Sequence, residues 1–179
     1  MDFLDGPPHP SVIGHAYGKR NLQIASALYN RQYGLNAVCV CPPTVYGPRD
    51  SFDPAKTKVV GGMVKRFVDA VQNKQEKVEC RGSGAPLREV AYVSDVAKLI
   101  VDAMLKYDDS ESPLNIGTGQ EVSIRELAEL VAKLVGYQGE ITWGDKKDNG
   151  QYRKRLDLSR MNQLLTRIEP TPLEVGLQA

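Results

Sequence analysis

A short apolar run over residues 37–41 (AVCVC) is the feature that most restricts the fold of this 179-residue chain. It follows a helical pattern over Tyr17–Tyr33, and Gly34 suits the position just after a helix. Apolar residues in an unbroken run are typical of a strand that is buried on both faces of a parallel sheet. A helix followed by such a strand predicts an α/β fold.

The rest of the sequence alternates between helical and short strand patterns. Ser123 and Glu126 have the spacing of a capping box, which predicts a helix that starts there and stops at Gly136. Residues 1–14 and 43–57 are rich in Gly and Pro and are expected to be loops. Further helices are expected over 59–73, 94–106 (with Ser94 as its cap) and 159–165, and strands over 76–81, 114–116 and 141–143.

Composition excludes several classes of function. The formal net charge of +1 gives no field that would attract nucleic acid or an anionic membrane. No apolar stretch approaches the roughly 20 residues of a membrane helix, so membrane insertion is not expected. The first ten residues lack the pattern of a signal peptide, which predicts a cytoplasmic protein, with an organelle left open. Three cysteines without a CxxC pair, together with only His9 and His15, predict no metal site.

Two glycine-containing turns resemble a dinucleotide loop only in part. Gly82-Ser83-Gly84 and Gly117-Thr118-Gly119 each lack the third glycine that such a loop needs for helix–strand packing. Pro86 would also obstruct a helix after the first turn. The second turn lies between a strand and a helix, but no acidic residue follows on a later strand. Both are therefore interpreted as turns rather than as cofactor sites.

Several segments together resemble the C-terminal part of the GDP-L-fucose synthase family, which are extended short-chain dehydrogenase/reductases (SDRs). TVYGP and NIGTG occur across nucleotide-sugar epimerases and dehydratases, whereas the order and spacing of the other segments indicate the fucose synthase branch. The matching segments are GPPHPS (6–11), AYGKRNLQIASALYNRQYG (16–34), PPTVYGPRDSF (42–52), GSGAPLREVAYVSDVA (82–97), NIGTGQEVSIRELAELVAKLVGYQGEITW (115–143) and KRLDLSRM (154–161).

The resemblance implies an incomplete Rossmann-like fold of the extended SDR type, made of the C-terminal part of the parallel sheet and the smaller substrate-binding domain. Residues 1–58 would be the remnant of the Rossmann-like catalytic domain. Residues 59–179 would be mainly substrate-binding, with some segments returning to the sheet. A complete member would carry its glycine loop, first five strands and a catalytic Ser or Thr ahead of residue 1.

The resemblance also identifies a catalytic pair in which one member is altered. The family uses Tyr-x-x-x-Lys on a helix, where residues four apart share one face. Lys19 matches the lysine, but His15 stands at the tyrosine position, and Tyr17 lies on a different face. A neighbouring lysine favours neutral histidine, and an imidazole places its nitrogens differently from a phenol oxygen. Lost or altered chemistry is favoured over a working histidine acid.

The resemblance implies NADP(H) as the cofactor, with binding in doubt for a chain without the glycine loop. Lys19 would hold the cofactor ribose. The family's Pro-Thr-Asn segment appears here without its asparagine, and Lys58 replaces a histidine that contacts the cofactor in the family. A lysine there could still meet a phosphate. The expected cofactor-binding residues are Lys19, Pro42, Pro43, Thr44, Val45 and Lys58.

Four positions are expected to bind the sugar nucleotide. Arg66 and Arg88 match substrate-binding arginines of the family, and guanidinium groups suit a diphosphate. Arg81 replaces a tryptophan of the pocket, and Asn149 replaces an aspartate that holds substrate. The alternative for either matching arginine is a solvated surface charge or an ion pair.

Three hypotheses follow. The chain is a GDP-L-fucose synthase-like oxidoreductase with lost or reduced activity, a non-catalytic assembly subunit, or a binding module for a GDP-sugar. Strands 37–41 and 114–116 would belong to an incomplete sheet with an exposed edge, which predicts aggregation or a covering protein chain. A truncated gene product and a genuine subunit of an assembly are both compatible with these observations.

Overall fold

The computed structural model describes residues 6–8, 10 and 13–179. The loop expected over residues 1–14 falls mostly outside this part of the chain, as does His9. The chain forms two compact units. The first contains residues 1–42, 98–116 and 157–167, and the second contains residues 43–97, 117–156 and 168–179. Each unit is described by itself.

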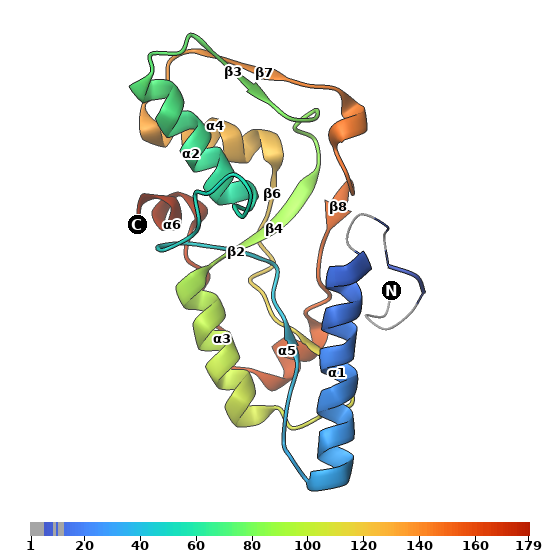
Figure 1. Ribbon diagram of the computed structural model, residues 1–179. Coiled ribbons are helices and arrows are strands. Elements are labelled where there is room, and N and C mark those ends of the chain that lie inside the picture. The colour runs from blue at the N-terminus through green and yellow to red at the C-terminus, as the bar shows by residue number, and fades with distance from the viewer. Residues whose placement is uncertain (1–5, 9, 11–12) are drawn as a thin grey trace. The chain divides into compact units, whose positions relative to one another are not determined.

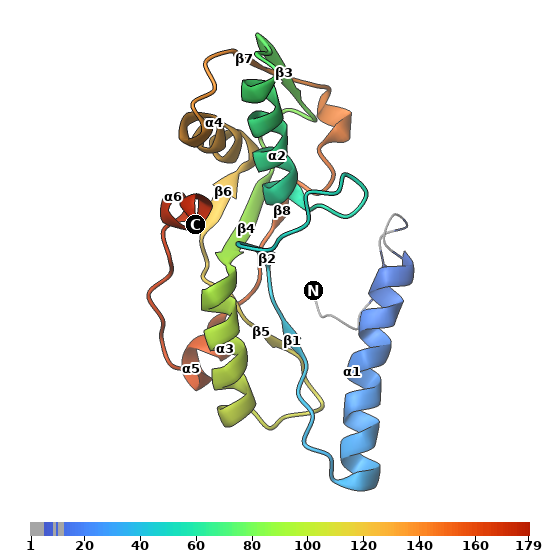
Figure 2. The same cartoon turned by 60° about the vertical axis from the view of Figure 1, so that its left-hand side comes forward.

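The first unit combines one long helix (Figure 1) with a short parallel strand pair (Figure 2). Its elements are α1 (Ile13–Tyr33), β1 (Val40–Cys41), most of α3 (Val93–Lys106), β5 (Leu114–Asn115) and α5 (Ser159–Leu164). The turn after α1 is as predicted, because Gly34 has φ of 66° and its N–H donates to the Asn30 carbonyl at 2.8 Å. Residues 114–116 and 159–165 are close to their predicted strand and helix.

The strand over 37–41 is shorter and more exposed than predicted. Val40 and Cys41 pair in parallel with Leu114 and Asn115, as Figure 2 shows. The side chains of Ala37–Cys41 are only partly buried. The expectation of burial on both faces is therefore wrong for this chain, because within the described residues β1 has a partner on one edge only.

The core of the first unit is apolar, but α1 contributes a polar side chain to it. Leu99, Leu114 and Ile116 are almost fully buried. Gln23 is the buried residue of α1, and its Nε2 donates to the Ser110 carbonyl at 2.8 Å. Near the other end of the helix Arg31 forms a bidentate pair with Glu111. Polar contacts therefore attach α1 to the loop before β5.

The second unit packs two helices against short strands. A sheet in the order β2-β4-β6 carries β8 beside β4, where β2 and β8 run parallel and β6 antiparallel to β4. A separate parallel pair joins β3 and β7. The elements are β2 (Thr44–Tyr46), α2 (Val59–Gln72), β3 (Lys77–Cys80), β4 (Leu87–Tyr92), β6 (Glu121–Ser123), α4 (Ile124–Val135), β7 (Glu140–Trp143), the 3₁₀ turn η2 (Lys146–Asp148), β8 (Arg153–Lys154) and α6 (Leu173–Gln178).

The core of this unit lies where α2 and α4 meet side by side (Figure 1). Each helix is apolar along one face, so that Phe67 of α2 and Leu127 and Val131 of α4 are buried together. The Tyr137 ring packs against Phe67 with 5.4 Å between ring centroids. Burial of these faces, rather than helix propensity alone, stabilises the two helices.

The ends of α4 confirm the sequence prediction. Ser123 Oγ accepts from Glu126 N at 3.1 Å, and Glu126 Oε2 accepts from Ser123 N at 2.8 Å. Gly136 has φ of 76° and ends the helix. By contrast, α3 begins at Val93, so Ser94 is not its cap, because β4 runs directly into the helix without a loop.

Three further elements differ from prediction. The loop expected over 43–57 contains β2, which forms only because β4 lies beside it. Arg153 and Lys154, for which no strand was predicted, form β8, which pairs with β4. The helix α6 was not predicted, and it packs on α4 and β4. Within the described residues, no helix has both the length and the apolar character needed to cross a membrane.

Candidate functional site

The predicted catalytic pair lies on α1 in the first unit. His15 and Lys19 are one helical turn apart on the same face, and both side chains are exposed. Tyr17 lies on another face, where the Arg20 guanidinium is 5.9 Å from the centre of its ring. Arg20 also donates to the Gly6 carbonyl at 2.8 Å. The arrangement therefore places His15, and not Tyr17, beside Lys19.

The predicted cofactor segment over residues 42–45 is divided between the units. Pro42 belongs to the first unit, and the other three residues belong to the second. Thr44 and Val45 are in β2, opposite Val90 and Ala91 of β4. Pairing with β4 fixes the backbone of Thr44 and Val45.

Lys58 immediately precedes α2, at its N-terminal cap position. Its side chain is exposed and makes no capping hydrogen bond, and the first turn of the helix contains no acidic residue. The positive end of the helix dipole and the lysine charge act at the same place. These charges attract an anion, whereas the Asp50 carboxylate, close to Gly61 in the first turn, acts against one. The cofactor role of Lys58 stays a prediction.

The turn over Gly82-Ser83-Gly84 is bound to Asn149. Asn149 Oδ1 accepts hydrogen bonds from Ser83 N at 2.8 Å and from Ser83 Oγ at 3.1 Å. Gly82 and Gly84 have φ of 75° and 77°, a conformation that favours glycine, and the strand β3 ends before them as predicted. The structure therefore brings Asn149 next to Arg81 through this turn, with the Asn149 acceptor already engaged by protein.

Arg125 and Trp143 support the other side of the same turn, and sequence reasoning missed both. Arg125 donates to the Ser83 carbonyl at 2.9 Å, and its guanidinium is 4.5 Å from the centre of the Trp143 ring. A Cβ on Gly84 would come within 2.8 Å of that ring. Arg125 lies inside the capping box, between Ser123 and Glu126, and this position gave no signal for its role, because the contact joins segments 42 residues apart.

The arginines expected to bind substrate differ in what they contact. Arg66, on α2, donates to the Glu79 carbonyl at 3.0 Å, and its charge also acts on the buried Cys80 thiol. Arg81 is 3.7 Å from Asp148 in an exposed ion pair. Burial raises the pKa of Cys80 despite its cationic neighbours. Arg66 and Arg81 thus keep their guanidinium groups at the surface of the second unit.

Arg88 is the half-buried member of this set. It lies on β4, and its Nη1 donates to the Leu87 carbonyl at 2.7 Å. Burial lowers the pKa of its guanidinium, as expected for a charge removed from water. A partly desolvated guanidinium interacts more strongly with an anion than a fully solvated one. Arg88 therefore has the properties of an anion-binding residue more clearly than Arg66 does.

The Gly117-Thr118-Gly119 turn binds a carboxylate of the protein itself. Glu89 is 2% exposed, and its Oε1 accepts from Gly119 N at 3.0 Å. Its Oε2 accepts from Leu156 N at 3.4 Å. The turn leads into β6 and not directly into a helix. The predicted turn is present, and the absence of a cofactor role stays a prediction.

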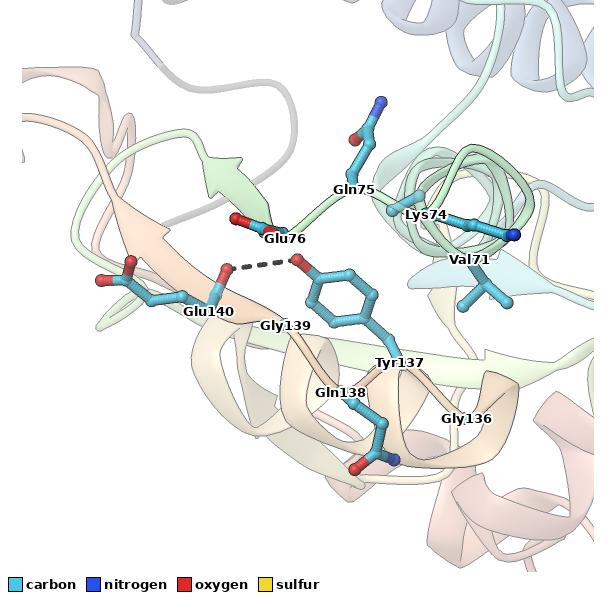
Figure 3. A pocket seen from close by; sticks show the side chains of 10 residues that line it. Val71, Lys74, Gln75, Glu76, Gly136, Tyr137, Gln138, Gly139 and Glu140 are labelled. Carbon is cyan, nitrogen blue, oxygen red and sulfur yellow. Dashed lines mark hydrogen bonds between the residues drawn. The ribbon is translucent and has the colours of Figure 1, made fainter.

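A cavity of about 520 Å³ lies at the ends of α2 and α4 in the second unit (Figure 3). Tyr137 Oη donates to the Glu140 carbonyl at 3.4 Å across it. The Gln75 and Gln138 side chains extend in opposite directions, so their amides do not converge. None of the residues expected to bind cofactor or substrate lines this cavity. No cluster of metal ligands is present among the described residues.

The chain matches the family model described as "NAD dependent epimerase/dehydratase family" over residues 2–117. The chain belongs to this family. It is 35% identical over 176 residues to "Probable GDP-L-fucose synthase 1" of Oryza sativa subsp. japonica. The alignment covers 98% of this chain and 53% of that protein. It is 38% identical to "GDP-L-fucose synthase" of Escherichia coli K12, in an alignment that covers 91% of this chain and 53% of that protein.

Solved structures agree with these relatives. A GDP-L-fucose synthetase of Naegleria fowleri bound to NADP is 28% identical, with a TM-score of 0.85, over 97% of this chain and 56% of that chain. A UDP-glucose 4-epimerase of Thermotoga maritima with UDP-glucose is 29% identical, with a TM-score of 0.76, over 93% of this chain and 50% of that one. The fold is therefore of the extended SDR type, and this chain spans about half the length of these family members.

Proposed function

We propose that this chain is a GDP-L-fucose synthase-like protein whose proton-transfer chemistry is lost or reduced. The observation that carries this proposal is the pair on α1, where His15 stands one turn before Lys19. In the family reaction GDP-4-keto-6-deoxymannose is epimerised at C3 and C5 and reduced at C4 with NADPH. A phenol hydroxyl beside the lysine exchanges the proton with the substrate oxygen.

Imidazole is a poor replacement for that phenol. Its ring is shorter than the phenol group, so its nitrogens cannot reach the position of the phenol oxygen. Tyr17 does not restore the pair, because it lies on another face of α1 with Arg20 over its ring.

NADP(H) would supply the hydride in the family reaction. Lys19 would hold its ribose, and Lys58 with the N-terminus of α2 would favour a phosphate. The exposed Lys58 side chain and the absence of an acidic residue in the first turn of α2 fit such a group. The described residues contain no loop with the three glycines of a dinucleotide site, so we expect weak cofactor binding to this chain alone.

The GDP-sugar would be bound by arginines of the second unit. Arg88 is the stronger candidate, because it is partly desolvated, and Arg66 lies on the surface of α2. Arg81 and Asn149 differ from the family pattern, and their polar groups contact Asp148 and Ser83. We therefore expect residual affinity for a diphosphate and weaker recognition of the rest of the nucleotide.

Two measurements test the proposal separately. Oxidation of NADPH with GDP-4-keto-6-deoxymannose is expected to be absent or very slow for the purified chain and faster for His15→Tyr in a preparation supplied with the front half of a family member. Tyr17→Phe should change nothing and is the matched control on the same helix. Efficient turnover by the unaltered chain would overturn the proposed loss of activity.

Binding is measured by calorimetry with GDP and with a GDP-sugar. Arg88→Ala is expected to remove the heat, whereas Arg167→Ala, an exposed arginine in the first unit, should leave it unchanged. If the unaltered chain gives neither heat nor a thermal shift at high GDP concentration, the binding part of the proposal fails, and the question of catalysis stays separate.

A second candidate function is that of an assembly subunit. Large apolar side chains of α1 are exposed on two sides of the helix, with Ile13, Tyr17, Ile24 and Leu28 on one side and Leu22, Tyr29 and Tyr33 on the other. Exposed apolar surface of this kind indicates a protein contact. A protein chain that supplies the rest of the sheet would cover such a helix.

Co-expression tests this second function. We expect the chain to co-purify with the front half of a family member and to lose this partner when Leu22 and Tyr29 are both replaced by serine. A stable, well-folded monomer that captures no such partner would count against it. Neither result bears on nucleotide binding, so the two proposals can fail independently.

A further inference from the structure

Asn149 and Gly150 form the only Asn-Gly pair in the sequence. Gly150 is exposed and has φ of 64°, and a Cβ built on it would have no atom within 4 Å. Glycine in open space rotates freely about its backbone bonds. The Gly150 amide nitrogen is therefore able to approach Asn149 Cγ. A side chain at position 150 would hinder this approach.

The Asn149 amide group is polarised by two donors. Ser83 N and Ser83 Oγ both donate to Oδ1, at 2.8 Å and 3.1 Å. Only an oxygen accepts a backbone N–H, so the network fixes which atom of the amide faces the turn and directs Nδ2 away from it. Two donors on a carbonyl oxygen stabilise the negative charge that develops there when a nucleophile attacks the carbon.

We propose that Asn149 deamidates spontaneously and converts its contact with the Ser83 turn from neutral to anionic. The Gly150 backbone nitrogen loses its proton to solvent and forms a bond to Asn149 Cγ. The Cγ–Nδ2 bond breaks, and Nδ2 leaves as ammonia after it takes up a proton from solvent. Water then opens the resulting succinimide at one of its two carbonyls and gives aspartate or isoaspartate. No electron transfer is involved, and water is the only co-reactant.

The product carboxylate lies in a setting that favours negative charge. An aspartate at this position keeps the two Ser83 donors, which bind a charged acceptor more strongly than a neutral one. Arg81, at the start of the same turn, is 3.7 Å from Asp148, the residue just before Asn149. Deamidation would place another carboxylate directly after Asp148 and lower the formal net charge of the chain from +1 to zero.

The experiment is a timed incubation of the full chain at mildly alkaline pH, followed by peptide mass spectrometry and an isoaspartate assay. Asn73 and Asn115, which precede Lys74 and Ile116, are the internal controls. We expect conversion at Asn149 to be several-fold faster than at either control, and an isoelectric shift that matches that of purified Asn149→Asp. Equal rates at the three asparagines would overturn the proposal.

Two variants at Ser83 test the role of its donors. Ser83→Ala removes the hydroxyl donor and should slow the conversion, whereas Ser83→Thr retains a hydroxyl and should keep the rate close to that of the unaltered chain. Circular dichroism and thermal melting show whether each variant is folded at the incubation temperature. Faster conversion in folded Ser83→Ala would mean that the turn protects Asn149, and would overturn the proposed assistance.

Discussion

The backbone of Gly176 in α6 lies directly against the Tyr46 hydroxyl of β2: a Cβ built on Gly176 would be 2.5 Å from that oxygen. Tyr46 is 4% exposed, and its ring packs on Tyr92 with 5.8 Å between centroids. The close approach of α6 to the sheet of the second unit therefore depends on the missing side chain.

Gly176→Ala is expected to destabilise the chain by about 1–3 kcal/mol, because the added methyl group forces α6 away from Tyr46. The comparison is Gly18→Ala on α1, where an added Cβ meets no atom within 4 Å. That change should be neutral or stabilising by up to about 1 kcal/mol, because alanine favours helix. Urea unfolding of both variants measures the difference, and equal midpoints would contradict it.

Ionisation of the Tyr46 hydroxyl is expected to destabilise the folded chain in alkaline solution. Burial, with the nearby charge of Asp95, raises the pKa of Tyr46 to about 12. The folded chain therefore holds this proton to a higher pH than the unfolded chain, so the free energy of unfolding falls as pH rises from about 10 to about 12. The full effect of this one group is roughly 2–3 kcal/mol.

The control for this pH dependence is Tyr46→Phe, which removes the titrating group. Tyr107 and Tyr137 also have a raised pKa from burial, and both remain in the variant. The difference between the two chains in free energy of unfolding, measured at several pH values, isolates Tyr46. The unaltered chain should lose more stability than Tyr46→Phe as pH rises, and parallel curves would show that Tyr46 does not contribute.

Glu89→Gln should destabilise the second unit by about 2–4 kcal/mol, because a buried backbone N–H would lose its acceptor. One side-chain oxygen would be replaced by an NH₂ group facing a backbone N–H, either of Gly119 or of Leu156. Glu129→Gln, on the exposed face of α4, is the matched control and should change stability little. Hydrogen exchange should report faster opening at Gly119 and Leu156 in the first variant only.

The capping box of α4 can be tested by a double-mutant cycle. Ser123→Ala is expected to cost about 1 kcal/mol, because Glu126 N loses its acceptor. Glu126→Ala removes the reciprocal bond to Ser123 N. The loss in the double variant should be smaller than the sum of the two single losses, since the two bonds act as a unit. Strict additivity would argue against the box.

Local sequence signals predicted the elements whose structure depends on neighbouring residues. The capping box at Ser123, the stop at Gly136 and the αL glycine after α1 are all present, because caps and turns are formed within a few residues. The Gly117–Gly119 segment was interpreted as a turn and not as a cofactor loop. In the structure its amide N–H binds the carboxylate of Glu89.

Contacts between distant segments could not be predicted in the same way. Thr44–Tyr46 was expected to be loop, and it becomes a strand because residues 90–92 lie beside it. Arg125 and Trp143 join the Ser83 turn from elements far along the chain, with no local pattern to mark them. The burial expected for residues 37–41 was wrong because an apolar sequence shows a preference for burial but does not supply the neighbouring strand.

The sequence by itself determined the α/β class, the family resemblance, and the replacement of a tyrosine by His15 before Lys19, since these depend on residue type and spacing. Only the tertiary structure decided what each candidate side chain contacts. It placed Asn149 on the Ser83 turn, Arg81 beside Asp148 and Arg88 in a half-buried position. The physical reason is that hydrogen bonds and burial depend on distances between segments, which residue order alone does not specify.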